Sequence, residues 1–457
     1  MRETGTLDSM RVALVSCYEL GHQPLGVAGP AAALREAGHE VRCVDLAVEP
    51  WDPSLVGWAD RLGCSVPMHT ATRIARLVID DVRRRRPELP VACFGLYGAA
   101  MADAADRVLA GETDAALVAW LAGDDDGRVV HLERVAHRSA PPARDLLPPI
   151  DRYARLLRGE RESVVGVVEA SRGCVHRCRH CPVPVVYDGR IRIVDVDSVL
   201  ADVEQQVAAG AEHLTFADPD FLNGPHHARR VVAAVHERFP SLSFDCTVKV
   251  EHVLAHPDVW PELAAAGCLF VVSAFESVDD ATLARLDKGH TAADEAAAVA
   301  VLRTHGIEVR PSWLPFTPWT TLDQLRRLVD FVAEHDLVGN VDPVQYTIRL
   351  LLPPGSLLLD HPDVVPHLGA YDPERASYSW RSAEPAMDAL QLELAELVEA
   401  GVGAGDPIPA VYGRVRAALG LPAVTVDEGR AAAVPRLSEP WFCCAEPTAA
   451  QLLPLPS

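Results

Sequence analysis

Three cysteines in one short run constrain this chain more than any other feature of its sequence. Cys174, Cys178 and Cys181 fall within eight residues, in the run Ser-Arg-Gly-Cys-Val-His-Arg-Cys-Arg-His-Cys-Pro. Each iron of a four-iron cluster takes a soft ligand such as thiolate. Three local thiolates leave one iron open. The spacing therefore predicts a [4Fe-4S] cluster that binds a small molecule rather than one that only passes electrons.

A zinc site is the alternative for the same run, with His176 or His180 as the fourth ligand beside the three cysteines. Structural zinc sites more often combine two separated ligand pairs, and no second pair lies near this run. The stretch 171–192 also has five arginines and one aspartate, a local balance of +4. Cations stabilise thiolates, and they could dock an acidic electron donor of the flavodoxin or ferredoxin type. We therefore favour the iron–sulfur interpretation.

The whole chain has 457 residues, a formal net charge of −22 and 49% hydrophobic residues. The length predicts two or three domains. The negative charge argues against binding to nucleic acid or to an anionic membrane, because both carry phosphate. No apolar run reaches the ~18 residues of a membrane span, and the polar first residues do not resemble a signal peptide. Eleven scattered cysteines fit a reducing compartment, so we expect a cytoplasmic protein.

Short apolar runs alternate with helical patterns in two blocks, which predicts an α/β protein with parallel sheets. The block 10–140 reads as a Rossmann-like domain, with strands expected at 10–17, 41–46, 90–95 and 114–120 and helices at 25–37 and 69–86. A linker at 141–160, Pro-rich at its start, follows. The block 161–355 has six expected strands, at 163–170, 213–217, 243–248, 269–274, 308–313 and 344–348. Six such strands fit a partial (β/α)6 barrel with the cysteine loop at one carboxyl strand end. Residues 356–457 form the last unit, a helical extension with an irregular tail.

The C-x-x-x-C-x-x-C spacing resembles the signature of the radical S-adenosylmethionine (SAM) superfamily, in which SAM chelates the open iron. The resemblance implies a partial-barrel core and reductive cleavage of SAM. It also implies SAM contacts at the strand ends. The candidates are Asp218 and Asp220 after the second strand, Ser273 and Glu276 at the end of the fourth, and Arg310 in the fifth. Carboxylates and hydroxyls suit the ribose and the cationic end of SAM, and a cation suits its carboxylate.

Two further cations follow strands of the same block. Lys249 comes after the third expected strand and Lys288 after the fourth. They are the only lysines of the chain, in which arginine supplies every other cation. Exposed charge is nevertheless the commoner role of a lysine, and we expect that role for both.

The front block resembles the cobalamin-binding domain that precedes many radical SAM cores. The form of this domain that coordinates cobalt has Asp-x-His-x-x-Gly after its first strand. Here the corresponding run, Tyr18–Gly26, keeps His22 but has Leu20 in place of the aspartate, and its glycine comes one position late. We interpret His22 as a loop histidine without a metal. Cobalamin stays a candidate cofactor, because the fold alone does not decide it.

The tail contains Trp441-Phe-Cys-Cys-Ala-Glu-Pro447, with the adjacent thiols Cys443 and Cys444. Neighbouring cysteines bridge poorly to each other, and two free thiolates suit a soft partner. The run resembles the tail that defines the CUAEP/CCAEP-tail radical SAM (seleno)proteins, some of which have selenocysteine at one of these positions. We therefore expect a reactive, catalytic role for the two cysteines.

These features predict a radical SAM enzyme that modifies an unidentified small molecule, by methyl transfer if cobalamin is bound. The alternative is transfer of the aminocarboxypropyl group of SAM to a soft element, such as arsenic or selenium, held by the tail thiols. A third hypothesis is a non-catalytic iron–sulfur or cobalamin sensor, or an electron-transfer protein. Three local cysteines argue against this last hypothesis, because electron transfer favours a fully ligated cluster.

Overall fold

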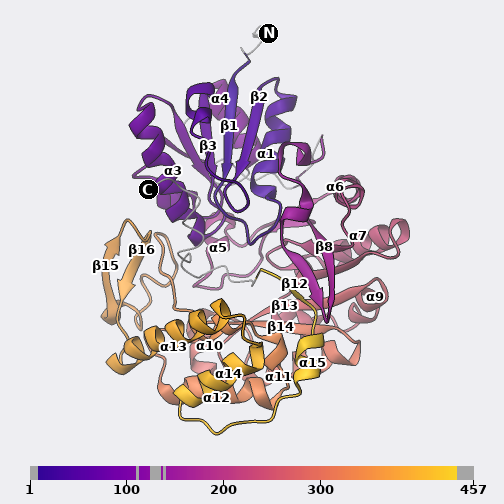
Figure 1. Ribbon diagram of the computed structural model, residues 1–457, viewed down its shortest axis with the longest axis vertical. Coiled ribbons are helices and arrows are strands. Elements are labelled where there is room, and N and C mark those ends of the chain that lie inside the picture. Colours follow the sequence, from indigo (N-terminus) through magenta and orange to yellow (C-terminus); the bar gives the residue numbers. More distant parts are fainter. Residues whose placement is uncertain (1–8, 110–112, 124–134, 137–139, 440–457) are drawn as a thin grey trace.

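The computed structural model describes residues 9–109, 113–123, 135–136 and 140–439. Figure 1 shows two sheet-containing regions, with the front domain above and the barrel region below. Of the predicted site residues, Cys443 and Cys444 lie outside the described part of the chain. No helix within that part is both long and apolar enough to cross a membrane.

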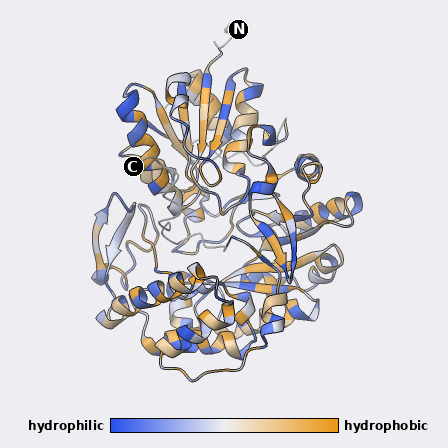
Figure 2. Cartoon of the chain, viewed as in Figure 1, coloured by the Kyte–Doolittle hydropathy of each residue, from blue (hydrophilic) through white to orange (hydrophobic). Residues whose placement is uncertain are grey.

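The front domain is built on a five-stranded parallel sheet. Its order is β2-β1-β3-β4-β5, with β1 at Arg11–Ser16, β2 at Glu40–Asp45, β3 at Arg61–Ser65, β4 at Val91–Phe94 and β5 at Arg107–Leu109. Helices pack on both faces, so the central strands are largely apolar, as Figure 2 shows. These helices are α1 at Leu25–Glu36, α2 at Ser54–Trp58, α3 at His69–Arg85 and α4 at Thr113–Ala122.

The second region is a seven-stranded curled sheet, of order β14-β13-β12-β11-β8-β7-β17. Five strands are parallel: β8 at Arg161–Val168, β11 at His213–Phe216, β12 at Ser243–Thr247, β13 at Cys268–Glu276 and β14 at Glu308–Trp313. The edge strands β7 (Arg155–Arg158) and β17 (Arg436–Leu437) are antiparallel to their neighbours. The outer helices include α6 at Val196–Ala208, α7 at Pro225–Arg238, α8 at Val250–Ala255, α9 at Trp260–Ala265, α10 at Asp280–Leu286, α11 at Ala292–Thr304 and α12 at Leu322–Glu334.

The C-terminal extension packs under the barrel and returns to it (Figure 1). It contains the hairpin β15–β16 and then three helices. Their bounds are Leu368–Asp372 and Ser377–Trp380 for the strands, and Pro385–Gly403, Ile408–Ala418 and Glu428–Ala433 for α13, α14 and α15. Beyond α15 the chain runs back to the sheet and adds β17 next to β7.

Two predicted strands are wrong. Residues 114–120 lie inside α4, whose alanine-rich sequence and first-turn Asp114 favour a helix. Residues 344–348 do not form the sixth barrel strand, because Pro343 opens a 3-10 turn that ends at Tyr346. The barrel therefore has five parallel strands in the described residues, and a single parallel bridge between Phe316 and Arg349 stands where the sixth was predicted. The sheet grows at its other edge through β7 and β17. The strand β3 and the hairpin β15–β16 were not predicted.

Candidate active site at the mouth of the barrel

The cysteine loop follows β9 (Ser171–Gly173) and leads into α5 (Val183–Tyr187). β9 pairs with β10 (Ile191–Val194), so an antiparallel ladder closes the loop at its base. Gly173 has φ +78°, and a Cβ added there would lie 2.3 Å from the carbonyl oxygen of Arg190. Only glycine fits this close approach. Cys178 is buried, and Cys174 and Cys181 are partly buried.

Asp218 fastens the start of this loop. Its Oδ2 accepts a hydrogen bond from the Ala170 N–H at 2.9 Å, and its Oδ1 accepts one from the Ser171 hydroxyl at 2.5 Å. The carboxyl group is 2% exposed, and burial raises its pKa to about 7. Both oxygens are therefore engaged with the loop. A direct contact of Asp218 with SAM stays a prediction.

Glu276 ends β13 beside the cysteine loop, with a φ of +69° that is rare for a residue with a side chain. Its Oε1 lies 3.0 Å from His180 Nε2 and 3.2 Å from Lys288 Nζ. Burial alone would raise the pKa of Glu276, but the Lys288 ammonium and the His180 ring outweigh burial and lower it to about 2. The Lys288 charge also interacts with Cys178 and Cys181. A buried cation thus faces both the carboxylate and the loop thiols.

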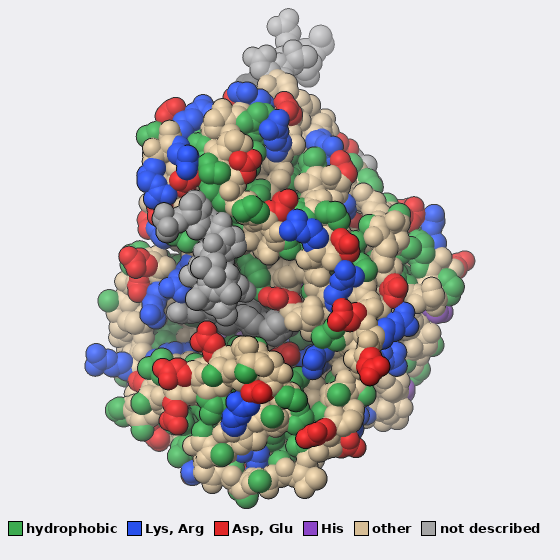
Figure 3. Space-filling model, in the orientation of Figure 1, with side chains coloured by type: hydrophobic (Ala, Val, Ile, Leu, Met, Phe, Trp, Pro, Cys, Tyr) green, Lys and Arg blue, Asp and Glu red, His purple; other side chains and the backbone are tan. Residues whose placement is uncertain are grey.

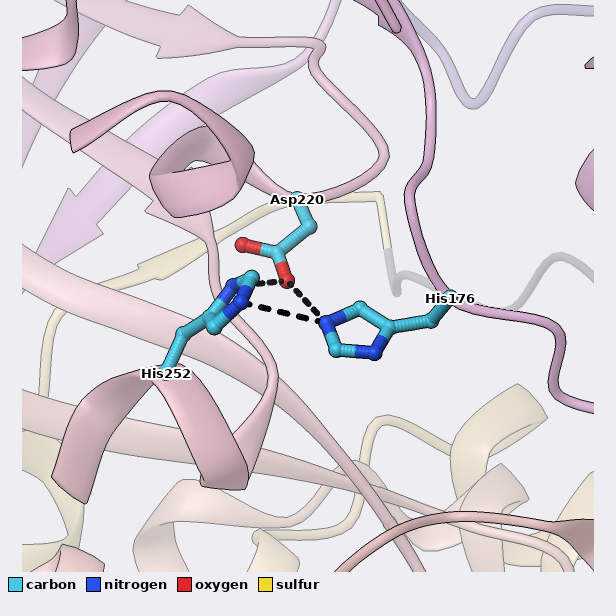
Figure 4. Close-up of side chains that lie close together, drawn as sticks. All are labelled: His176, Asp220 and His252. Atoms are coloured by element: carbon cyan, nitrogen blue, oxygen red, sulfur yellow. Dashed lines mark hydrogen bonds and ion pairs between the residues drawn. The ribbon is translucent and has the colours of Figure 1, made fainter. Parts of the chain in front are cut away.

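A second polar group lies on the other side of the loop (Figure 4). His252 Nδ1 is 2.7 Å from Asp220 Oδ2, and His252 Nε2 is 3.2 Å from His176 Nε2. Lys249 Nζ is 3.1 Å from His176 Nδ1 and 3.0 Å from Glu251 Oε2. Burial and the Lys249 ammonium lower the pKa of His176 to about 4, so this ring is neutral at pH 7.

A metal ion is one ligand that the group of His176, Asp220 and His252 suggests, because one ligand atom from each residue lies within 4.8 Å of the others. The Lys249 ammonium is only 3.1 Å from the same His176 ring and repels a cation placed there. One carboxylate and one ammonium side by side suit a zwitterionic ligand better than a metal ion.

The prediction that both lysines carry exposed charge is wrong. Lys249 is 8% exposed and Lys288 is 2% exposed. The two residues lie 39 positions apart in the sequence, yet both contact the surroundings of the cysteine loop. Their rarity was the one sequence signal that set them apart. The roles of His180, His252 and Glu251 left no such signal.

The other two predicted SAM contacts have partners of their own. The buried Ser273 hydroxyl donates to the carbonyl oxygen of Val248 at 2.7 Å. Arg310 pairs with Asp342 at 2.7 Å and faces the carbonyl oxygen of Pro435 at 3.5 Å. Arg310 therefore connects β14 with the returning C-terminal segment, and its contact with the SAM carboxylate stays a prediction.

The loop residues fit an iron–sulfur cluster better than the zinc alternative. His176 faces His252 and His180 faces Glu276, so both candidate fourth ligands are already engaged away from the cysteines. Burial raises the pKa of Cys174 to about 11. A buried thiol of this kind becomes a thiolate only when a metal centre or a cation stabilises the charge. The three thiols and the Lys288 ammonium provide such an environment.

The front domain has a cavity of about 380 Å³ where β1 and β2 end. Its lining residues are Cys17, Tyr18, Gly21, Leu46, Ala47, Val48, Ile74, Arg152, Tyr153, Ala154, Ser438 and Glu439. No histidine is among the described lining residues. His22 is buried, and burial lowers its pKa to about 4, with Asp245 of the barrel and Arg144 among its charged neighbours. The described residues of this cavity therefore offer no imidazole to a cobalt ion.

The size of this cavity also argues against a corrinoid. Sites for drug-sized ligands have volumes of about 300–1,000 Å³, and a corrinoid with its nucleotide tail is larger than such a ligand. In addition, Ser438 and Glu439 of the C-terminal segment form part of the wall. With these walls, the cavity is smaller than a corrinoid needs.

A parallel partial barrel with a three-cysteine loop at its mouth defines a class of iron–sulfur enzymes that act on a bound cofactor. Comparison with known families agrees, because residues 168–332 match the profile of the radical SAM superfamily. Residues 168–332 thus form a radical SAM domain, and such a domain implies a [4Fe-4S] cluster and SAM.

Two curated relatives are methyl-transferring enzymes. The hopanoid C-3 methylase of Methylococcus capsulatus is 23% identical over 330 residues, which are 65% of this chain and 62% of the relative. The bacteriochlorophyllide d C-8(2)-methyltransferase of Chlorobaculum tepidum is 24% identical over 249 residues, which are 51% of this chain and 53% of the relative. The chain thus spans between half and two thirds of the length of these relatives.

Two solved structures share the fold over most of this chain. The cobalamin-dependent radical SAM enzyme OxsB, solved with aqua-cobalamin, matches with a TM-score of 0.67 and 15% identity over 87% of this chain and 68% of its own. The radical SAM methyltransferase TsrM of Kitasatospora setae, solved with cobalamin and a [4Fe-4S] cluster, matches with a TM-score of 0.55 and 19% identity over 72% of this chain and 70% of its own. At these identities the likeness shows the fold alone.

Proposed function

We propose that this protein cleaves SAM reductively at a [4Fe-4S] cluster held by Cys174, Cys178 and Cys181, and modifies a small molecule by radical chemistry. The observation that carries the proposal is the convergence of three thiols and two buried lysines at the barrel mouth. When bound, the cluster supplies the electron that breaks a carbon–sulfur bond of SAM. The protein's own residues bind and orient SAM and exclude water from it.

Two pairs of side chains suit the two ends of SAM. Asp220 and Lys249 suit its amino and carboxylate groups, since one offers a carboxylate and the other an ammonium. Glu276 suits the ribose hydroxyls, and Lys288 holds this carboxylate ionised. Ser273 and Asp218 stabilise the neighbouring backbone, because Ser273 donates a hydrogen bond to the Val248 carbonyl oxygen and Asp218 accepts one from the Ala170 N–H. A flavodoxin or ferredoxin supplies the electron that reduces the cluster.

The product class separates two candidate reactions. Methyl transfer to carbon is favoured by the names of both curated relatives and by the cobalamin in the solved neighbours. Transfer of the aminocarboxypropyl group to a thiol-held soft element is favoured by the front cavity, because no histidine is among its described lining residues and Glu439 forms part of its wall. Cys443 and Cys444 follow Glu439 by four and five positions in the sequence.

Mass spectrometry of the small molecules distinguishes these reactions. The protein is reconstituted anaerobically with iron and sulfide, and then reductant and SAM are added. 5′-Deoxyadenosine indicates radical cleavage, S-adenosylhomocysteine indicates methyl transfer, and methylthioadenosine indicates aminocarboxypropyl transfer. Each product should disappear in Cys178→Ala. A loaded cluster that gives none of the three products would contradict the proposal and favour the sensor hypothesis.

A further inference from the structure

The cavity at the ends of β1 and β2 occupies the position at which open α/β sheets bind their ligands. Its most unusual wall is the chain's own C-terminal segment, Ser438 and Glu439. We propose that this cavity is the seat of the C-terminal tail, residues 440–457, and not of a corrinoid. The front domain then serves to hold the two tail thiols beside the barrel. This inference rests on the path of the tail and not on the proposed SAM chemistry.

The path of the segment is fixed by backbone pairing. In β17, Arg436 and Leu437 pair antiparallel with Leu157 and Leu156 of β7. Ser438 N–H donates to the carbonyl oxygen of Arg155 at 2.8 Å, and Arg155 N–H donates to the Ser438 hydroxyl at 2.9 Å. The ladder thus extends the barrel sheet by one strand that points at the front domain.

Glu439 then contacts the front domain directly. The Tyr18 hydroxyl donates to Glu439 Oε1 at 2.5 Å. A Cβ added to Gly21, which has φ +67°, would lie 2.8 Å from Glu439 Cγ. A side chain at position 21 would therefore collide with the segment. Glycine at this position permits both the backbone conformation and the close approach of Glu439.

The residues that follow Glu439 in the sequence are apolar, as is part of the cavity wall. Leu46 and Ile74 are buried apolar residues of its wall, and Glu439 is the one acidic residue among the described lining residues. The tail continues with Pro440, Trp441 and Phe442, an apolar and aromatic run. A cavity of about 380 Å³ is at the lower end of the drug-sized range of about 300–1,000 Å³. It has room for one or two aromatic side chains.

Chain length limits how far the thiols reach. Cys443 is four residues beyond Glu439, and an extended chain spans at most about 3.6 Å per residue, or about 14 Å here. Figure 3 shows acidic and basic side chains intermingled on the part of this face that the described residues form. The anchor at Glu439 thus keeps Cys443 and Cys444 near this boundary.

Disulfide trapping tests whether the C-terminal tail occupies the cavity. Ala47 lines the cavity and is exposed, so Ala47→Cys places a thiol where the tail is expected. Ala209→Cys is the matched control, because Ala209 is also exposed but caps the carboxyl end of α6 and does not line the cavity. Both full-length variants are mildly oxidised without a reconstituted cluster, and the disulfides are mapped by peptide mass spectrometry.

Tethering raises the effective thiol concentration, so we expect about ten-fold more disulfide to Cys443 or Cys444 in Ala47→Cys than in Ala209→Cys. Equal yields would overturn the proposal. SAM cleavage, assayed separately on reduced and reconstituted samples, reports on the proposed function. Loss of SAM cleavage with an intact cross-link would contradict only that function.

Two further measurements check the proposal independently: the effect of a Gly21 variant on the cross-link, and the binding of a corrinoid. Gly21→Ala, combined with Ala47→Cys, should lower the cross-link yield several-fold. Gly306→Ala has the same backbone strain, with φ +73° and no atom within 4 Å of its new Cβ, and should leave the yield unchanged. The unmodified full chain should retain no hydroxocobalamin after gel filtration. Retention of one corrinoid per chain, with a fall in cross-link yield, would overturn the proposal.

Discussion

At the scale of the residue, the choice of lysine over arginine marks the site. The chain has 42 lysines and arginines together, and only Lys249 and Lys288 are lysines. An ammonium is a compact point charge, whereas a guanidinium is planar and larger. Beside Glu276 and His180 the space is closed, and Lys288 is 2% exposed. A compact cation is what this buried position accepts.

Lys288→Met should abolish SAM cleavage and destabilise the protein by about 3–5 kcal/mol, because it leaves the Glu276 carboxylate buried without a cation. The double variant Lys288→Met, Glu276→Gln removes both charges and should recover much of the stability but not the activity. Urea unfolding and 5′-deoxyadenosine formation measure the two effects. Equal destabilisation in the single and double variants would contradict the pairing.

Asp218 makes stability depend on pH. Its folded pKa of about 7 exceeds the usual value of 3.8, so the folded protein keeps a proton that the unfolded chain has released. The contribution of Asp218 to stability is therefore fully present below about pH 4 and falls as the pH rises to about 7, by up to about 4 kcal/mol. Asp218→Asn does not titrate, so its stability should decline less between pH 5 and pH 8. Parallel urea-unfolding profiles of the two proteins would argue against this assignment.

At the scale of the element, the β9–β10 ladder presents the cysteine loop. Gly173→Ala should displace the loop, because its Cβ would lie 2.3 Å from the Arg190 carbonyl oxygen, and backbone cannot move aside as a side chain can. We expect at least a several-fold loss of cluster iron after reconstitution. Gly159→Ala is the control, since it has φ +61° but open space around its Cβ. If both variants load iron equally, the loop is not held in this way.

Local sequence patterns predicted most helices and strands, but they did not predict which strands pair with one another in every case. The apolar run of β1 and the helical spacing of α3 lie within one residue of their expected bounds. Residues 114–120 and 344–348 were assigned wrongly because a short apolar run reads alike as strand or helix. The pairing of β17 with β7 joins residues about 280 positions apart, and no local pattern encodes it.

The same limit applies to the site. Motif spacing identified the loop cysteines, and strand-end position identified Asp220 and Glu276 as polar residues of the mouth. It did not reveal that His180 would pair with Glu276, because these residues are 96 positions apart. Nor did it reveal that Arg310 would pair with Asp342. Side-chain partners depend on the packing of several strands at once, which a single sequence does not display.

At the scale of the whole molecule, one buried arginine joins the front domain to the barrel. Arg144 lies between the two and donates to Asp202 at 2.9 Å, to the Val167 carbonyl oxygen at 2.6 Å and to the Gln23 carbonyl oxygen at 3.1 Å. Its side chain is 7% exposed and that of Asp202 is 2% exposed. The guanidinium therefore binds the linker, α6, β8 and the loop after β1 in one network.

The neighbouring residue gives this network a natural control. Asp145 pairs with Arg35 through two bonds of 2.8 Å, and these side chains are 63% and 43% exposed. The two arginine–carboxylate pairs thus differ mainly in burial. Exposed pairs contribute about 0–1 kcal/mol to stability, whereas removal of one partner from a buried pair costs about 3–5 kcal/mol.

Arg144→Met should therefore destabilise the protein by about 3–5 kcal/mol, and Arg35→Met by at most about 1 kcal/mol. Because the lost bonds lie between the two regions, Arg144→Met should also split urea unfolding into two transitions, since domains that are no longer coupled unfold separately. Hydrogen exchange should then increase in the loop after β1 and in α6 together. A single transition, with a loss of stability below about 1 kcal/mol, would show that Arg144 does not couple the two regions. Their remaining contacts would then be sufficient to couple them.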